Sequence, residues 1–135
     1  MTRAAPAFAV ALTLGLGAVP AASFAHHSFA MYDTNRTVTL NGAVKAIQWT
    51  NPHVVVWIEA TPAAGGASQT WTVEATSPGN LGRIGWTRKS LKAGDKVAID
   101  VAPLRDGGRG GSLRKVKLID TGQVFSGNWI MPAKP

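Results

Sequence analysis

The chain contains no cysteine. This absence excludes disulfide bonds and thiolate metal sites, so the fold has to be held together by its hydrophobic core. Acidic residues are also scarce, because seven Asp and Glu stand against 14 Lys and Arg, which gives a formal net charge of +7. No low-complexity block or internal repeat is present, and 135 residues leave room for one small domain.

The sequence also lacks the usual patterns of catalysis. No Ser–His–Asp order has a hydrolase context, and no two carboxylates stand at a suggestive spacing. The glycine-rich segment Gly107–Gly111 lacks the Lys-Ser/Thr pair and the following helix of a phosphate-binding loop. We therefore expect a binding protein and not an enzyme.

One long apolar run occurs, at the N-terminus. Arg3 supplies a short positive start, and Ala4–Val19 carries no charge. Ser23 and Ala25 are the small residues that signal peptidases prefer just before a cut. The pattern predicts a signal peptide over residues 1–25, cleaved after Ala25, and a periplasmic protein.

An uncleaved membrane anchor is the alternative, because the run approaches the ~20 residues that span a bilayer. Its many Ala and Gly residues, together with Pro6 and Pro20, make it a weak permanent span. Cleavage leaves residues 26–135 as a single domain that begins with His26. The membrane is then a partner only through the transient signal peptide.

Alternating apolar and polar residues predict an all-β body. The five expected strands are Arg36–Thr50, His53–Thr61, Gln69–Ala75, Lys96–Leu104 and Leu113–Asp120. In the first of them the apolar phase switches after Gly42, which predicts a bulge or bend that lets a long strand coil.

A short helix is expected between the third and fourth strands. Ser77 is suited to cap its start and Pro78 to its first turn, while Gly79 and Gly82 weaken it. Three strands, a helix and two strands are the order of a five-stranded OB-like barrel. Another small barrel or a compact sandwich are the alternatives. The C-terminal tail, residues 122–135, is expected to pack back on the body.

Three histidines carry the most specific functional signal: His26, His27 and His53. A mature N-terminal histidine offers its α-amine and its Nδ1 to one metal, and His53 can supply a third nitrogen. Nitrogen-rich sites suit Cu(II) best among the divalent metals, so copper is the expected cofactor. This site requires the segment Ser28–Thr37 to fold back across the barrel. Asp33, Glu74, Met31 and Met131 are further possible ligands.

Two other interpretations of these histidines stay open. The amine, a deprotonated amide and the imidazole of His27 can chelate a metal without any fold. His53 can instead be structural, with Nδ1 bonded to the turn at Asn51, within the segment Trp49–His53 (WTNPH). Trp49 then belongs to the core.

Five tryptophans are many for a chain of this size. Trp57 and Trp71 lie on expected strands and are predicted to fill the core. Trp86 and Trp129 lie in expected loops, where an aromatic ring either seals the barrel or forms a stacking platform. The core interpretation is favoured for both.

Basic residues dominate the second half of the chain. Asp95, Asp100 and Asp106 are the acidic residues in the same span. The ten basic residues are Arg83, Arg88, Lys89, Lys92, Lys96, Arg105, Arg109, Arg114, Lys115 and Lys117. Such a face binds an anionic envelope polymer or lipid surface, or merely keeps the domain soluble. Because nucleic acid is scarce outside the cytoplasm, it is not an expected partner.

Four segments together resemble an uncharacterised family of exported bacterial proteins, known only as a domain of unknown function. They are HHSFAMYD, VTLNGAVKAIQWTNPHVVVWIEA, the segment from Trp71 to Asn80, and GWTRKSLKAGDKV. The signature positions that match are His26, His27, Ser28, Phe29, Trp49, Asn51, Pro52, His53, Ser77, Pro78, Leu81, Gly85 and Trp86.

This resemblance covers nearly the whole mature chain and implies a small exported β-barrel. It brings no established activity, so it supplies no mechanism. The chain departs from the family pattern at Gly79 and Gly82, where relatives have a stretch that favours a helix. The helix is therefore expected to be short or frayed here.

Overall fold

The structure is a computed structural model that describes residues 30–127. These residues form seven elements in chain order. The elements are β1 (Val38–Trp49), β2 (Val54–Pro62), β3 (Gln69–Glu74), α1 (Pro78–Arg83), β4 (Lys96–Pro103), β5 (Gly110–Leu118) and β6 (Val124–Ser126). The chain thus follows the predicted order of three strands, one helix and two strands, with one further short strand.

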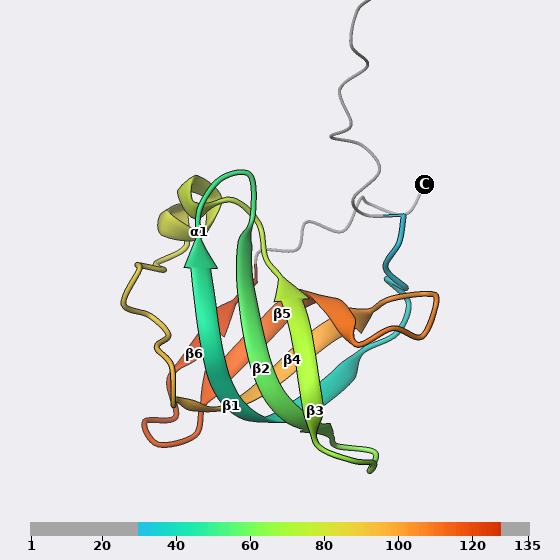
Figure 1. The fold of residues 1–135 in the computed structure, drawn as a ribbon. Coiled ribbons are helices and arrows are strands. Elements are labelled where there is room, and N and C mark those ends of the chain that lie inside the picture. Colours follow the sequence, from blue (N-terminus) through green and yellow to red (C-terminus); the bar gives the residue numbers. More distant parts are fainter. Residues whose placement is uncertain (1–29, 128–135) are drawn as a thin grey trace, which may run out of the picture.

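The strands form one sheet that closes on itself (Figure 1). Its order is β3-β2-β1-β4-β5-β6, with antiparallel neighbours, and a parallel pairing of β3 with β5 completes the ring. The five-stranded OB-like barrel expected from the sequence is confirmed. Among residues 30–127, β6 pairs with β5 alone and lies outside the closed ring.

Strand β1 takes part in both halves of the barrel, because its first half pairs with β4 and most of its length pairs with β2. A bulge falls between Val44 and Ala46, two residues beyond the predicted switch at Gly42. Gly42 has a different role. A Cβ there would lie 2.0 Å from the carbonyl oxygen of Glu59, so only glycine lets β1 and β2 approach this closely.

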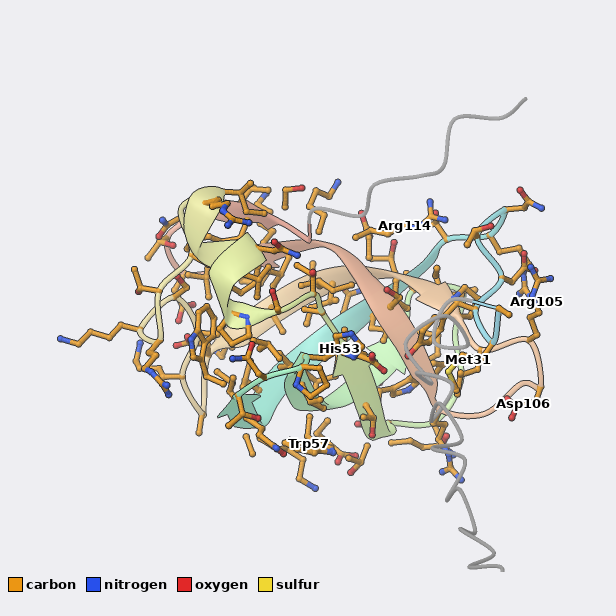
Figure 2. All side chains as sticks on the ribbon, turned by 90° about the horizontal axis from the view of Figure 1, so that it is seen from above. Met31, His53, Trp57, Arg105, Asp106 and Arg114 are labelled. Atoms are coloured by element: carbon orange, nitrogen blue, oxygen red, sulfur yellow. The ribbon has the colours of Figure 1, made fainter. Side chains whose placement is uncertain are left out.

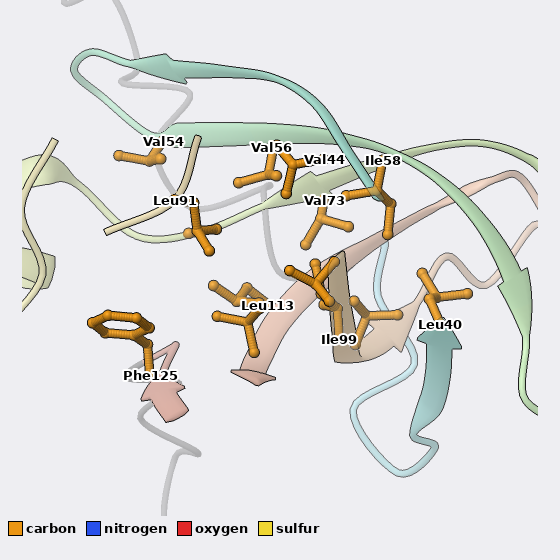
Figure 3. Close-up of a cluster of buried hydrophobic side chains, with 14 of the residues drawn as sticks. Leu40, Val44, Val54, Val56, Ile58, Val73, Leu91, Ile99, Leu113 and Phe125 are labelled. Atoms are coloured by element: carbon orange, nitrogen blue, oxygen red, sulfur yellow. The ribbon is translucent and has the colours of Figure 1, made fainter. Parts of the chain in front are cut away.

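The barrel interior is filled by aliphatic side chains that alternate along the strands (Figure 3). Leu40, Ile58, Val73 and Ile99 are each fully buried, and they come from four different strands. After the bulge the inward phase of β1 changes, so Ile47 and Trp49 pack against this core as partly buried residues.

Helix α1 follows the expected capping pattern and lies at the end of the barrel where β1 stops and β2 begins (Figure 1). Ser77 is the N-cap, and its hydroxyl accepts a hydrogen bond of 3.2 Å from the backbone N–H of Asn80. Leu81 is the helix residue that enters the core. No helix among residues 30–127 is long and apolar enough to cross a bilayer.

The second half of the chain differs from the prediction in one strand boundary and in one additional strand. β5 begins at Gly110, three residues earlier than expected, because Gly110 and Gly111 pair with β3 and β4. In the expected tail, β6 adds a strand that the sequence patterns did not indicate. Its Phe125 is buried, so this part of the tail packs on the body. Trp129, Ile130 and Met131 lie outside the described residues.

The tryptophans divide differently from the prediction. Trp57 was expected in the core, but Val56 and Ile58 on either side of it point inward and Trp57 points outward, only partly buried. Trp71 packs against the core as predicted. Trp86 is 4% exposed and lies 4.9 Å from the ring of Phe125, so it seals the barrel and is no stacking platform.

Candidate functional site

His53 lies in the connection between β1 and β2, directly before the first residue of β2, and its side chain is 33% exposed. Figure 2 looks down on this end of the barrel. The imidazole Nδ1 of His53 binds Oε1 of Glu74. The structural interpretation of His53 predicted a bond from Nδ1 to the turn at Asn51. In the structure, Nδ1 instead binds the carboxylate of Glu74 on the neighbouring strand β3.

Glu74 is delivered to His53 by the pairing of β2 with β3. Val55 pairs with Glu74, and the backbone N–H of Val54 donates to the carbonyl oxygen of Thr76 at 3.1 Å. Val73 and Ala75 are buried in the core, so the alternation of the strand turns Glu74 outward. Its carboxylate therefore lies beside the residue that precedes β2.

Tyr32 brings the N-terminal segment to the same carboxylate. Its hydroxyl donates to Oε2 of Glu74 at 2.8 Å, and the side chain is 4% exposed. The backbone around it pairs with the end of β4, through a bridge to Leu104 and a 2.8 Å hydrogen bond from Asp33 N–H to the carbonyl of Pro103. Glu74 thus binds His53 through one carboxylate oxygen and Tyr32 through the other.

Two arginines hold this N-terminal segment in place. Arg105 donates from Nε to the carbonyl oxygen of Ala30 at 3.1 Å, and its backbone N–H donates to the carbonyl of Met31 at 2.9 Å. Arg114 donates from Nη2 to the carbonyl oxygen of Thr34. Figure 2 shows Met31 and Arg105 to one side of His53. These two members of the predicted basic face therefore have a structural role.

Barrel closure explains why residues so distant in sequence meet here. β5 pairs with β3 at Glu74 and Ser112, and with β4 at Ser112 and Ala102. The end of β4, against which the N-terminal segment runs, is therefore one strand away from Glu74. Because Tyr32 pairs with Leu104 and its hydroxyl reaches Glu74, we infer that its side chain crosses the outer surface of that intervening strand. Ala102 and Ser112 turn outward by register and are nevertheless 0% and 5% exposed, as expected for a covered surface.

The environment of Tyr32 fixes its protonation state. Burial raises the pKa of its phenol well above the ordinary value, and the hydrogen bond to the Glu74 carboxylate raises this pKa further. Tyr32 is therefore a neutral hydrogen-bond donor at physiological pH. It cannot act as a phenolate ligand without losing its bond to Glu74.

The three predicted metal ligands are placed as follows. His53 belongs to the cluster just described, whereas His26 and His27 lie outside the described residues. Within residues 30–127, no three His, Cys, Asp or Glu side chains come together in a way that holds a metal. The described part of the molecule thus offers one imidazole with a carboxylate behind it. Asp33, a further possible ligand, accepts a hydrogen bond from the N–H of Asn35.

Sequence reasoning considered Glu74 as an oxygen ligand but gave no role to Tyr32. A signal was present, because Tyr32 is the only tyrosine of the chain and lies six residues after the predicted N-terminal histidine. The outward position of Glu74 also follows from the alternation of its strand. The contact between the two depends on the β3–β5 closure, which local patterns do not reveal.

A second concave region lies on another part of the barrel. It is an open hollow of about 390 Å³ between the α1–β4 connection and the β5–β6 hairpin. Lys89 and Lys92 line it, together with Leu118 and Phe125. Asp95 also lines it and pairs with Lys92 at 2.9 Å, which cancels part of the positive charge. No histidine is among the described residues that line it.

Comparison with known proteins gives a family and no activity. No curated protein and no solved structure matches the chain. The sequence does match a family of unknown function, DUF6152, over residues 14–114, which include Tyr32, His53 and Glu74. The chain therefore belongs to the DUF6152 family.

Proposed function

We propose that this protein is an exported, periplasmic, non-enzymatic binding protein that holds a copper ion between its mature N-terminus and His53. The observation that supports the proposal most directly is the shared carboxylate of Glu74. It binds Nδ1 of His53 with one oxygen and the hydroxyl of Tyr32 with the other. One residue thereby connects the candidate ligand with the segment that leads to the N-terminus.

The Glu74–His53 contact has the chemistry of a prepared metal ligand. Histidines that bind metals usually donate their second ring N–H to a carboxylate, which fixes the tautomer and makes the other nitrogen more basic. With Nδ1 held by Glu74, Nε2 is the nitrogen that His53 presents to a metal. In this proposal Glu74 orients the ligand and is not itself a ligand.

The anchored segment makes the second half of the site reachable. Tyr32 is the sixth residue after His26, and an extended chain spans at most about 3.3–3.6 Å per residue. After cleavage at Ala25, the α-amine of His26 is therefore confined to roughly 20 Å from the Tyr32 backbone. His26 or His27 is then available to meet His53. Met31, which is 48% exposed and precedes Tyr32 in the chain, would be a further ligand, through its thioether sulfur.

Cu(II) would bind nitrogen ligands at this position more tightly than Ni(II) or Zn(II) would. The protein's part is to present the imidazole of His53 and an unprotonated amine. Because the reference pKa of an α-amine is about 7.7–8.0, binding is expected to weaken as the pH falls below this range.

The export step is tested by mass spectrometry of the native protein from cell fractions. The proposal expects a periplasmic species whose first residue is His26. A native N-terminus at any other residue would contradict the amine ligand, whatever the protein binds.

The site itself is tested by calorimetric titration of Cu(II) into the chain that begins at His26. We expect affinity at least about tenfold above that of a free His-His peptide, equivalent to about 1.4 kcal/mol, and loss of this gain in His53→Ala. Gln48→Ala is the matched control, because Gln48 is an exposed polar residue at the same end of the barrel. Peptide-like affinity that is unchanged in His53→Ala would overturn the proposal.

A further inference from the structure

One corner of the barrel surface combines exposed apolar and basic side chains. Ile119 and Val124 are 52% and 53% exposed, the two highest values among the large hydrophobic residues that the structure describes. Lys96 and Lys117 are exposed beside them. We refer to these four residues as the corner patch.

Backbone pairing makes the corner patch contiguous. Lys117 pairs directly with Val124 across β5 and β6, and the N–H of Ile119 donates to the carbonyl of Lys96 at 2.9 Å. Val97, Val116 and Phe125 beside them are buried, so strand alternation turns Lys96, Lys117 and Val124 to the outer face. Ile119, in the turn directly after β5, is exposed next to them. Two cations and two aliphatic side chains therefore share one surface.

The lysines of the patch keep their charge available for a partner. Among residues 30–127, the lysines in ion pairs are Lys45, Lys92 and Lys115. Lys96 and Lys117 are in none of these pairs. Asp95, next to Lys96 in the sequence, is paired with Lys92, and Asp120 lies in the adjoining turn.

We infer that the corner patch docks the protein on an anionic phospholipid membrane. The lysines complement the negative charge of the headgroups, and this attraction is worth roughly fivefold in affinity for each lysine near the surface. A purely ionic polymer uses the lysines and leaves Ile119 and Val124 in water. A bilayer interface also accepts the two aliphatic side chains, as it does the apolar face of an amphipathic element. The inference is independent of copper binding.

The inference is tested with the chain that begins at His26, because the whole barrel lies within residues 30–127 and the apolar N-terminal run would itself bind lipid. Co-sedimentation is measured with vesicles of phosphatidylcholine alone and with added phosphatidylglycerol. We expect binding to the anionic vesicles only, with loss of binding as salt is raised from about 0.15 M to 1 M.

Two double variants separate the contributions of charge and apolar contact. Lys96→Gln with Lys117→Gln is expected to weaken binding about 30-fold, and Ile119→Ser with Val124→Ser about tenfold. The controls are Lys115→Gln, whose lysine is already paired with Asp100, and Ile84→Ser, whose residue is 39% exposed directly after α1.

Three results would overturn the inference. They are equal binding to neutral vesicles, patch variants that bind like the two controls, and a charge dependence with no effect of the Ile119 and Val124 changes. The last result would mean that the lysines act alone, as they would toward any anionic surface. Because all four patch residues are exposed, circular dichroism is expected to show unchanged folding in both double variants.

Discussion

The hydroxyl of Tyr32 donates a 2.8 Å hydrogen bond to Oε2 of Glu74, and this bond joins the N-terminal segment to the third strand of the barrel. The other oxygen of the same carboxylate binds Nδ1 of His53. A single side chain therefore fixes the relation between the start of the domain and the loop that carries His53. A change at Glu74 affects both contacts at once.

Replacing Glu74 with glutamine tests its role as the residue that orients His53. The uncharged amide is a weaker partner for the imidazole N–H, so we expect Cu(II) to bind about 10–100-fold less tightly than in the unaltered protein. Calorimetric titration gives the affinity. Glu59→Gln is the control, because Glu59 is an outward-facing carboxylate on the paired strand β2. Equal affinity in the two variants would contradict the orienting role.

Alkaline titration tests the buried hydrogen bond of Tyr32. Because Tyr32 is the only tyrosine, phenolate absorbance reports this one side chain. Burial, and then the contact with Glu74, raise the pKa of its phenol in the folded state above the unfolded value of about 10. The sign follows from linkage: the stabilisation is complete below pH ~10 and is lost as the pH rises through the folded pKa.

We therefore expect phenolate to appear only above about pH 10 in the folded protein, together with the loss of tertiary structure seen by tryptophan fluorescence. The same chain in guanidinium chloride provides the control, with a midpoint near 10. A folded protein that titrates at the unfolded midpoint would show that Tyr32 is accessible to solvent and not held by Glu74.

Much of the fold was predictable because short-range sequence patterns indicate the barrel strands. The inward positions of β2 and β4 alternate without interruption, so period-two patterns place both strands to within one or two residues. The start of β5 was not predicted, because Gly110 and Gly111 have low strand propensity. Here a Cβ on Gly111 would lie 2.7 Å from the side chain of Val101, so close packing explains the glycine.

The site was less predictable than the fold for a physical reason. His53 was found because histidines are few and it follows a turn. Its partner Glu74 depends on the β2–β3 register, and Tyr32 depends on the parallel closure of β3 with β5. These pairings are set by the whole barrel. No pattern within a short window encodes them, so the cluster became visible only in three dimensions.

The different positions of Trp86 and Trp57 lead to a stability prediction. Trp86 is buried, and its indole N–H donates to the carbonyl of Ser126 at 2.7 Å, whereas Trp57 points outward from β2. We expect Trp86→Ala to lower the free energy of unfolding by about 3–5 kcal/mol. Trp57→Ala should cost about 1 kcal/mol or less, the scale of a cross-strand surface contact. Urea unfolding compares the two, and similar losses would mean that Trp57 does belong to the core.

The close approach of β1 and β2 at Gly42 gives the last prediction. An added Cβ would lie 2.0 Å from the carbonyl oxygen of Glu59 and 2.7 Å from the Cα of Ala60, both of them backbone atoms that cannot turn aside. Gly42→Ala must therefore push β1 and β2 apart at this point. We expect a loss of about 3 kcal/mol or more in the free energy of unfolding, measured by urea titration.

Gly79→Ala is the matched control for this substitution. Gly79 lies in α1, nothing is within 4 Å of an added Cβ, and alanine favours a helix over glycine. The control variant is expected to be more stable than the unaltered protein by about 0.5–1 kcal/mol. Replacing glycine with alanine is thus expected to lower the free energy of unfolding at position 42, because of backbone contact, and to raise it at position 79, because of helix propensity. A Gly42→Ala protein as stable as the original would show that the strands do not meet so closely.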